Sequence, residues 1–239
     1  MIPPWLPVLA GASLAVGLVL ALAVALDEMR RPQQMWIMNV VWPVTVLYGT
    51  FLGLWFYARY GRAPVAGHPS ATHHMHEAPT PFPIMVAKST AHCGSGCTVG
   101  DLIAEWLAFF VPVIAVWLGY GSVFSEKMFA VWILDFIFAF VLGILFQYFV
   151  IKPMRDLSAG RALVEALKAD TVSLIFWQIG MYGFMAVAAF VIWRDLFGLR
   201  LVVDSVEFWF MMQLAMWCGF ITSYPANWWL LRVGVKEAM

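Results

Sequence analysis

The chain has 239 residues, of which 63% are hydrophobic and only 12% are charged. Soluble domains carry about 45–50% apolar and about 25% charged residues, so a soluble fold of this length would expose large apolar patches and is excluded. The formal net charge is zero, which leaves no basic surface for a nucleic-acid partner.

Six continuous apolar runs are each long enough to cross a bilayer as an α-helix, which takes about 20 residues. Continuous runs favour helices over barrel strands, which would alternate in segments of about ten residues. The sequence therefore predicts an all-α, polytopic membrane helical bundle that forms a single domain in contact with the lipid bilayer. The six predicted spans cover residues 4–26, 35–57, 98–120, 128–151, 171–193 and 207–231.

The first run has an alternative interpretation as a cleaved signal peptide, because Ala23-Val24-Ala25 resembles a cleavage site. Its length and the lack of Lys or Arg before it argue against cleavage. With six spans, nine Lys and Arg residues fall on the side of the C-terminus and five on the other side. The positive-inside rule then predicts that both termini are cytoplasmic.

Two predicted connections are longer than a simple turn. Residues 58–97 are polar and rich in Pro and Gly, and we expect a loop that contains histidine and cysteine. Residues 154–169 have the pattern of a short amphipathic helix, with Leu157, Leu163 and Leu167 on one face. Such a helix is either a solvated linker or lies on the inner leaflet.

All five histidines fall in the first of these connections. Imidazole binds copper, zinc and nickel, and a thioether adds a preference for Cu(I). A flexible tract of this composition predicts metal capture, and the alternative is a polar linker without a function. The residues of the tract are His68, His73, His74, Met75 and His76.

The same connection ends in the motif HCGSGC, in which Cys93 and Cys97 follow His92. Flexible glycines between the cysteines allow both sulfurs to face one ion or to form a disulfide. Three readings stay open, namely a metal site, a redox pair and a tight turn that begins a helix. Cytoplasmic thiols stay reduced, which favours metal, and a set of three ligands suits Cu(I) better than a closed zinc site with four.

Charged and sulfur-containing residues inside the spans give a second set of candidates. Asp101 and Glu105 lie four residues apart on one helical face, and Asp135 lies at similar depth in the next span. Intramembrane acids usually face the bundle interior, so these three line an ion path or form structural pairs. Methionine pairs four residues apart, at 181 and 185 and at 212 and 216, either pass Cu(I) along or simply pack.

Four segments carry a resemblance to a known family. They are RRPQQMWIMNVVWPVTVLYG, HCGSGCTVGD, WILDFIFAFVLGILFQYFVIKPMR and TSYPANWWLLRVGVKEAM. Together, from Arg31 to the end, they resemble a bacterial integral membrane family known only as a domain of unknown function, DUF family 4396. The resemblance implies a location in the bacterial inner membrane and supplies no reaction.

We therefore expect a membrane protein that binds and transports or otherwise handles a soft metal ion, Cu(I) or Zn, with copper favoured. We expect the histidine tract to capture the ion and His92, Cys93 and Cys97 to hold it. The three acids would then line its path through the bundle. The alternatives are a membrane thiol oxidoreductase that uses the cysteine pair and an accessory or scaffold subunit with a membrane-protein partner or a second copy. No Walker loop is present, and no catalytic residue is predicted.

Overall fold

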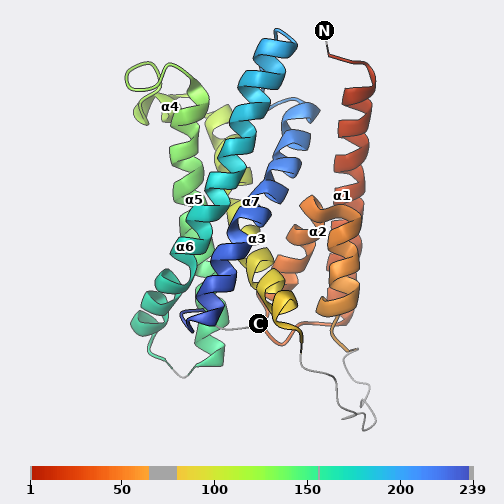
Figure 1. Cartoon of the computed structure of the whole chain (residues 1–239), viewed down its shortest axis with the longest axis vertical. Helices are drawn as coiled ribbons and strands as arrows, with labels where there is room; N and C mark the ends of the chain where they lie inside the picture. The colour runs from red at the N-terminus through yellow and green to blue at the C-terminus, as the bar shows by residue number, and fades with distance from the viewer. Residues whose placement is uncertain (1, 65–79, 156, 237–239) are drawn as a thin grey trace.

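The structure is a computed structural model and describes residues 2–64, 80–155 and 157–236. Within these residues the chain forms α-helices and short π-helical segments and no β-strand, so the predicted all-α bundle is confirmed (Figure 1). The elements are α1 (Trp5–Arg30), α2 (Met38–Phe56), η1 (Tyr57–Gly61), α3 (Phe82–Phe110), α4 (Val113–Trp117), α5 (Lys127–Met154), α6 (Ala159–Ala186), η2 (Val187–Leu196) and α7 (Val206–Arg232).

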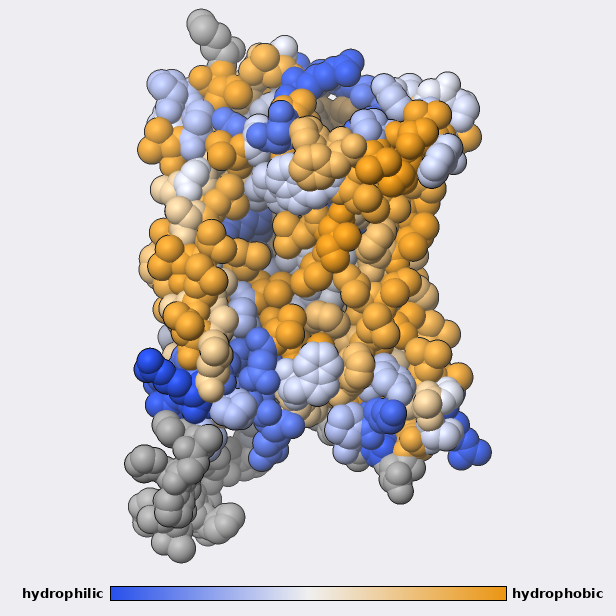
Figure 2. All heavy atoms as spheres, turned by 180° about the vertical axis from the view of Figure 1, so that it is seen from behind, coloured by the Kyte–Doolittle hydropathy of each residue, from blue (hydrophilic) through white to orange (hydrophobic). Residues whose placement is uncertain are grey.

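The face of the bundle shown in Figure 2 is largely hydrophobic in its middle part, between two more polar ends. Four helical stretches of the described residues are long and apolar enough to cross a membrane. The prediction of six such spans is therefore wrong in number. The four stretches are Trp5–Arg30, Met38–Gly61, Lys127–Pro153 and Ala159–Leu196.

The difference in number comes from α3 and α7, which are long but less apolar. Every residue from Ser89 to Thr98 is buried, so nearly three turns of α3 are surrounded by protein. A helix buried on all sides does not need an apolar face toward lipid, and it can carry polar groups that find partners inside the bundle. The buried face of α7 likewise carries Gln213, Ser223 and Asn227.

The stretch Met38–Gly61 folds back on itself instead of passing through the bundle. Thr50 has a φ of 46° and breaks the helix midway, in a region that residues with a Cβ rarely occupy. The returning arm packs on the first arm, with the rings of Trp42 and Tyr57 5.6 Å apart between centroids. Arg62, directly after the returning arm, lies 2.8 Å from Asp27 near the end of α1. We call α2 with η1 the hairpin.

The hairpin changes the path of the whole chain. The hairpin enters and leaves at one end, while α1, α3, α5, α6 and α7 run through the bundle in alternating directions (Figure 1). The start of α1 and the end of α7 consequently lie at opposite ends of the bundle. The prediction that both termini share one side is wrong, because an apolar run long enough to cross a membrane turns back at Thr50.

The distribution of positive charge becomes more uneven with this path. The hairpin places Arg30 and Arg31 at the end where α1, α5 and α7 end, together with the nine Lys and Arg residues already counted on the C-terminal side. We call this the basic end, and it carries eleven of the 14 Lys and Arg residues. The opposite end, called the far end, carries the other three, which are Lys127, Arg194 and Arg200.

The segment 154–169 is not a separate helix. From Ala159 onward it forms the first turns of α6, which continues to Ala186 because no proline or helix-ending glycine interrupts it. The buried face of these turns carries the alanines at 162, 166 and 169. Leu163 and Leu167 are exposed, whereas Leu157, which precedes α6, packs against the buried cluster that contains Ile144 and Ile151. The three leucines therefore do not act as one face.

Candidate functional site

The predicted loop up to residue 97 is wrong, because α3 begins at Phe82 and includes the whole HCGSGC motif. Glycine is a poor helix former in isolation, yet here it permits unusually close packing. A Cβ built on Gly96 would lie 2.9 Å from the Cα of Gly143, and one on Gly100 would lie 2.5 Å from the backbone N of Ala139. The motif is therefore a contact surface for α5, of the kind that small residues form between membrane helices.

The burial of α3 also decides where the predicted metal ligands point. His92 and Cys93 are successive helical residues and point about 100° apart. The His92 ring packs toward Phe146 with 6.1 Å between centroids, whereas Cys93 packs with Trp177 in another part of the core. Among the described residues no three His, Cys, Asp or Glu side chains form a metal-binding group. The structure thus does not bring His92, Cys93 and Cys97 together as one set of ligands.

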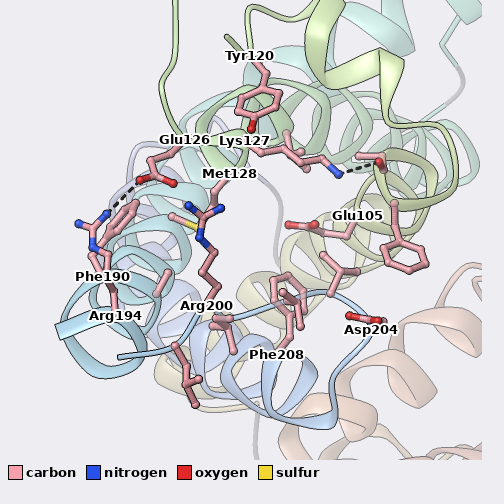
Figure 3. A pocket seen from close by; sticks show the side chains of 18 of the residues that line it. Glu105, Tyr120, Glu126, Lys127, Met128, Phe190, Arg194, Arg200, Asp204 and Phe208 are labelled. Atoms are coloured by element: carbon pink, nitrogen blue, oxygen red, sulfur yellow. Dashed lines mark hydrogen bonds and ion pairs between the residues drawn. The ribbon is translucent and has the colours of Figure 1, made fainter. Parts of the chain in front are cut away.

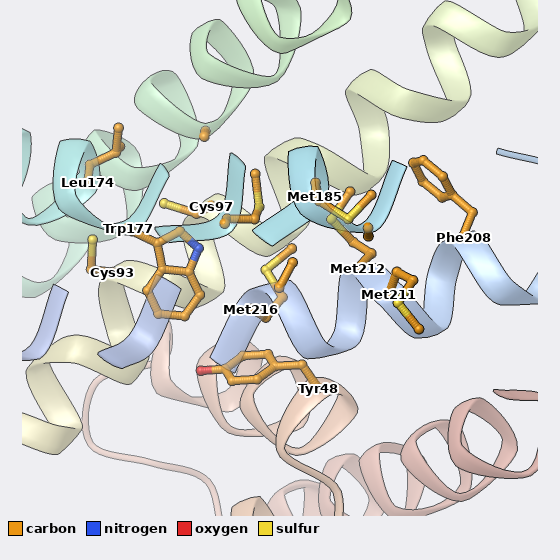
Figure 4. Close-up of a cluster of buried hydrophobic side chains, with 14 of the residues drawn as sticks. Tyr48, Cys93, Cys97, Leu174, Trp177, Met185, Phe208, Met211, Met212 and Met216 are labelled. Atoms are coloured by element: carbon orange, nitrogen blue, oxygen red, sulfur yellow. The ribbon is translucent and has the colours of Figure 1, made fainter. Parts of the chain in front are cut away.

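Methionines from α6 and α7 belong to the same buried cluster of apolar side chains as the two cysteines (Figure 4). Two thiols from α3 and five thioethers from α6 and α7 lie in it, and we call these seven residues the sulfur cluster. The Thr98 hydroxyl lies 3.3 Å from the Met216 sulfur, which ties α3 to α7 at this level. The sulfur cluster consists of Cys93, Cys97, Met181, Met185, Met211, Met212 and Met216.

Both cysteines are free thiols and both are completely buried. Cys218 is also free but is only partly buried and is absent from the cluster. A buried thiol surrounded by apolar side chains is shielded from soluble thiol partners. This position does not favour the thiol oxidoreductase alternative, which stays a prediction.

The three predicted intramembrane acids do come together, and we call them the acidic cluster. Asp101 and Glu105 on α3 lie within electrostatic range of Asp135 on α5. Gln178 on α6 donates a hydrogen bond of 3.2 Å to one oxygen of Asp101. The second oxygen of Asp101 and both oxygens of Asp135 have no hydrogen-bond partner within the described part of the chain. Buried acids in this state must hold a proton or a cation.

A cavity of about 410 Å³ leads from the far end to this cluster, with Glu105 on its wall (Figure 3). Lys127 also lines the cavity and donates a hydrogen bond of 3.1 Å to the carbonyl of Ala108. Arg194 pairs with Glu126 at 3.0 Å on the opposite wall. The cavity thus gives solvent a charged opening toward the first of the three buried acids.

Part of the prediction falls outside the described residues. The tract His68, His73, His74, Met75 and His76 lies there, so its role in metal capture stays a prediction. Conversely, sequence reasoning missed a buried ion pair between Lys236 and Asp170, 3.0 Å apart. Its only signal in the sequence was an aspartate next to an apolar run, and its partner lies 66 residues away.

These features define an all-α bundle with helices able to cross a membrane and with sulfur and carboxyl groups buried along one central helix. The family described as Domain of unknown function (DUF4396) matches residues 84–236. The chain belongs to this family, and the match covers α3 to α7, which contain both clusters. The segment RRPQQMWIMNVVWPVTVLYG, which begins at Arg30, lies outside the match. No curated protein and no solved structure matches the chain.

Proposed function

We propose that this chain is a multi-pass protein of the bacterial inner membrane that binds Cu(I) inside the bundle and passes it along α3. One observation carries the proposal, namely that two thiols and five thioethers from three helices lie in one buried cluster. Thiolate and thioether sulfurs are the ligands that Cu(I) prefers. Zinc suits this cluster less well, because its protein ligands are thiolates, imidazoles and carboxylates rather than thioethers.

The positions of the other groups support a route through the bundle. The cavity opens at the far end beside Glu105, and Asp101 lies one turn below Glu105 on the same face of α3. Cys97 follows one turn further, next to the level at which Thr98 contacts Met216. A cation that enters at the cavity therefore meets the carboxylates of α3 before it reaches the thiol of Cys97. Carboxylates attract a cation of any kind, and the sulfurs select a soft one.

A binding experiment tests this proposal with a matched control. We expect that the Cys93→Ser/Cys97→Ser variant binds Cu(I) about tenfold more weakly or worse in competition with a chelator, because two ligands lose their sulfur. Cys218→Ser is the control, since Cys218 is outside the cluster, and it should bind like the wild type. The histidine tract is intact in all three proteins, so it does not contribute to the difference. Equal affinities for the wild type and the double variant would reject the sulfur cluster as the site.

The charge distribution supports an orientation in this membrane. The basic end would face the cytoplasm by the positive-inside rule, which puts the C-terminus inside and the N-terminus outside. The short connection between α1 and the hairpin distinguishes this path from six spans, because six spans would place it outside.

Thiol labelling in whole cells tests the orientation. Each new cysteine is exposed, with Gln34→Cys in the connection after α1, Gly160→Cys at the basic end and Ser122→Cys at the far end. We expect a membrane-impermeant maleimide to label Ser122→Cys in intact cells, and the other two only after permeabilisation. The unaltered chain controls for its native thiols. Labelling of Gln34→Cys in intact cells would contradict the hairpin path.

A further inference from the structure

The chain after α7 turns back into the bundle. Gly234 adopts a φ of 74°, and the backbone N–H groups of Val235 and Lys236 both donate to the carbonyl of Leu230, at 3.1 and 3.2 Å. A glycine with positive φ commonly ends a helix in this way and reverses the chain. The reversal carries Lys236 inward, and its side chain is completely buried.

The ammonium group of Lys236 lies between two oxygen ligands. It donates to Asp170 Oδ1 and to Asn227 Oδ1, each at 3.0 Å. The amide nitrogen of Asn227 donates to the hydroxyls of Ser173 and Ser223, at 2.7 and 3.0 Å. The two serines thus hold the amide so that its oxygen faces the positive charge. We call Asp170 and Asn227, with the space between them that the ammonium fills, the tail site.

Further polar atoms in this part of the core remain unused. Asp170 Oδ2, Gln147 Oε1 and both nitrogens of His92 have no hydrogen-bond partner in the described residues. Each of these side chains is at least 98% buried. Gly143 allows the aspartate to approach α5 closely, since a Cβ there would lie 2.9 Å from Oδ2. Buried polar atoms are almost always satisfied, so this region is built for more polar contacts than one ammonium group makes.

We propose that the tail site is a binding site for a small monovalent cation, Na⁺ or K⁺, which the ammonium of Lys236 occupies as a tethered substitute. Oxygen ligands suit hard cations. A single carboxylate balances a single positive charge, so exchange of the ammonium for Na⁺ or K⁺ keeps the site neutral. With Lys236 in place the site is closed, and when the tail withdraws the aspartate is open to a mobile ion.

This inference does not use the sulfur cluster, and its test contains no copper. The test compares thermal unfolding of the full chain in detergent at equal ionic strength, in NaCl, in KCl and in the chloride of the bulky cation N-methyl-D-glucamine. Lys236→Met removes the tethered charge and keeps the length of the side chain. We expect Na⁺ or K⁺ to raise the unfolding temperature of Lys236→Met by about 3 °C or more over the bulky cation, because only the folded state holds the ion.

Three controls restrict the interpretation. The wild type should show no such difference, because its site is occupied. The Lys236→Met/Asp170→Asn variant should show none, because the charge that holds the ion is gone. Lys168→Met, which removes an exposed lysine of the same end, should behave like the wild type. A folded Lys236→Met protein without a difference between the small cations and the bulky one overturns the proposal.

Loss of the folded protein would still decide the question. If Lys236→Met is recovered as a folded monomer only when Na⁺ or K⁺ is present during purification, the proposal is supported. If it fails to fold in all three salts, the lysine is a structural ion-pair partner and no ion replaces it, which overturns the proposal. The copper-binding experiment above is independent of each of these outcomes.

Discussion

Gly100→Val is expected to separate α3 from α5 and to destabilise the fold strongly. A Cβ at this position would lie 2.5 Å from the backbone N and 2.6 Å from the Cα of Ala139. Both of these atoms belong to the backbone, so no side-chain rotation relieves the overlap and the helices must move apart. Overpacked sites cost about 1–3 kcal/mol and sometimes more, and a clash with backbone belongs at the upper end.

The matched control for this variant is Gly183→Val in α6, where nothing lies within 4 Å of the added Cβ. Both replacements put a β-branched residue into a helix, so the intrinsic helix propensity changes equally. Thermal unfolding in detergent and the yield of monodisperse protein measure the difference. We expect a clear loss for Gly100→Val alone. Similar unfolding temperatures for the two variants would mean that α3 and α5 are not packed as closely as described.

Asp170→Ala is expected to destabilise the bundle by about 3–5 kcal/mol, because it leaves the Lys236 ammonium buried without its partner. The side chains of both residues are completely buried, so water does not compensate for the loss. The exposed pair of Lys168 and Glu165 lies at a similar distance, 3.1 Å, and an exposed pair contributes only about 0–1 kcal/mol. Glu165→Ala is therefore the matched control.

A double-mutant cycle separates the ion pair from simple loss of packing. Addition of Lys236→Met to Asp170→Ala removes the stranded charge, and we expect it to recover most of the lost stability. In the exposed pair the second replacement, Lys168→Met, should change little. If Asp170→Ala and Glu165→Ala lower the unfolding temperature equally, the buried pair contributes no more than a surface pair and the described tail does not hold Lys236 inside.

The helices that face lipid are the part of the fold that the sequence predicts well. Apolar runs at residues 4–26 and 128–151 correspond to α1 and α5 within a few residues, because the requirement for an apolar face is local. The turn at Thr50 has no such local signal. The run through it is apolar on both sides, and length alone cannot distinguish one crossing from two half-crossings.

The HCGSGC motif shows how burial overrides local preference. Three glycines within seven residues predict a flexible turn in water, and the same glycines form a helix where a neighbouring backbone needs the space of a side chain. That close approach depends on Ala139 and Gly143, which lie on another helix. The start of α3 therefore depends on tertiary packing, which cannot be predicted from the local sequence alone.

The sequence predicts which residue types form the candidate site better than it predicts which of these residues come together. The spacing of Asp101 and Glu105 and the depth of Asp135 anticipated the acidic cluster. The sulfur cluster combines residues that the sequence suggested separately, because the pairing of α3 with α6 and α7 is not visible in any one segment. The burial of Lys236 could not be predicted from the sequence, since a lysine near the end of a chain is normally solvated.

The most direct test of the proposed function is X-ray absorption spectroscopy at the copper edge on the purified chain loaded with one equivalent of Cu(I). Sulfur is easily distinguished from nitrogen or oxygen in the coordination sphere. The sulfur cluster predicts a sphere of sulfur atoms that is lost in the Cys93→Ser/Cys97→Ser variant and kept in Cys218→Ser. A sphere dominated by nitrogen in the wild type would place the ion on histidine instead and would contradict the proposal.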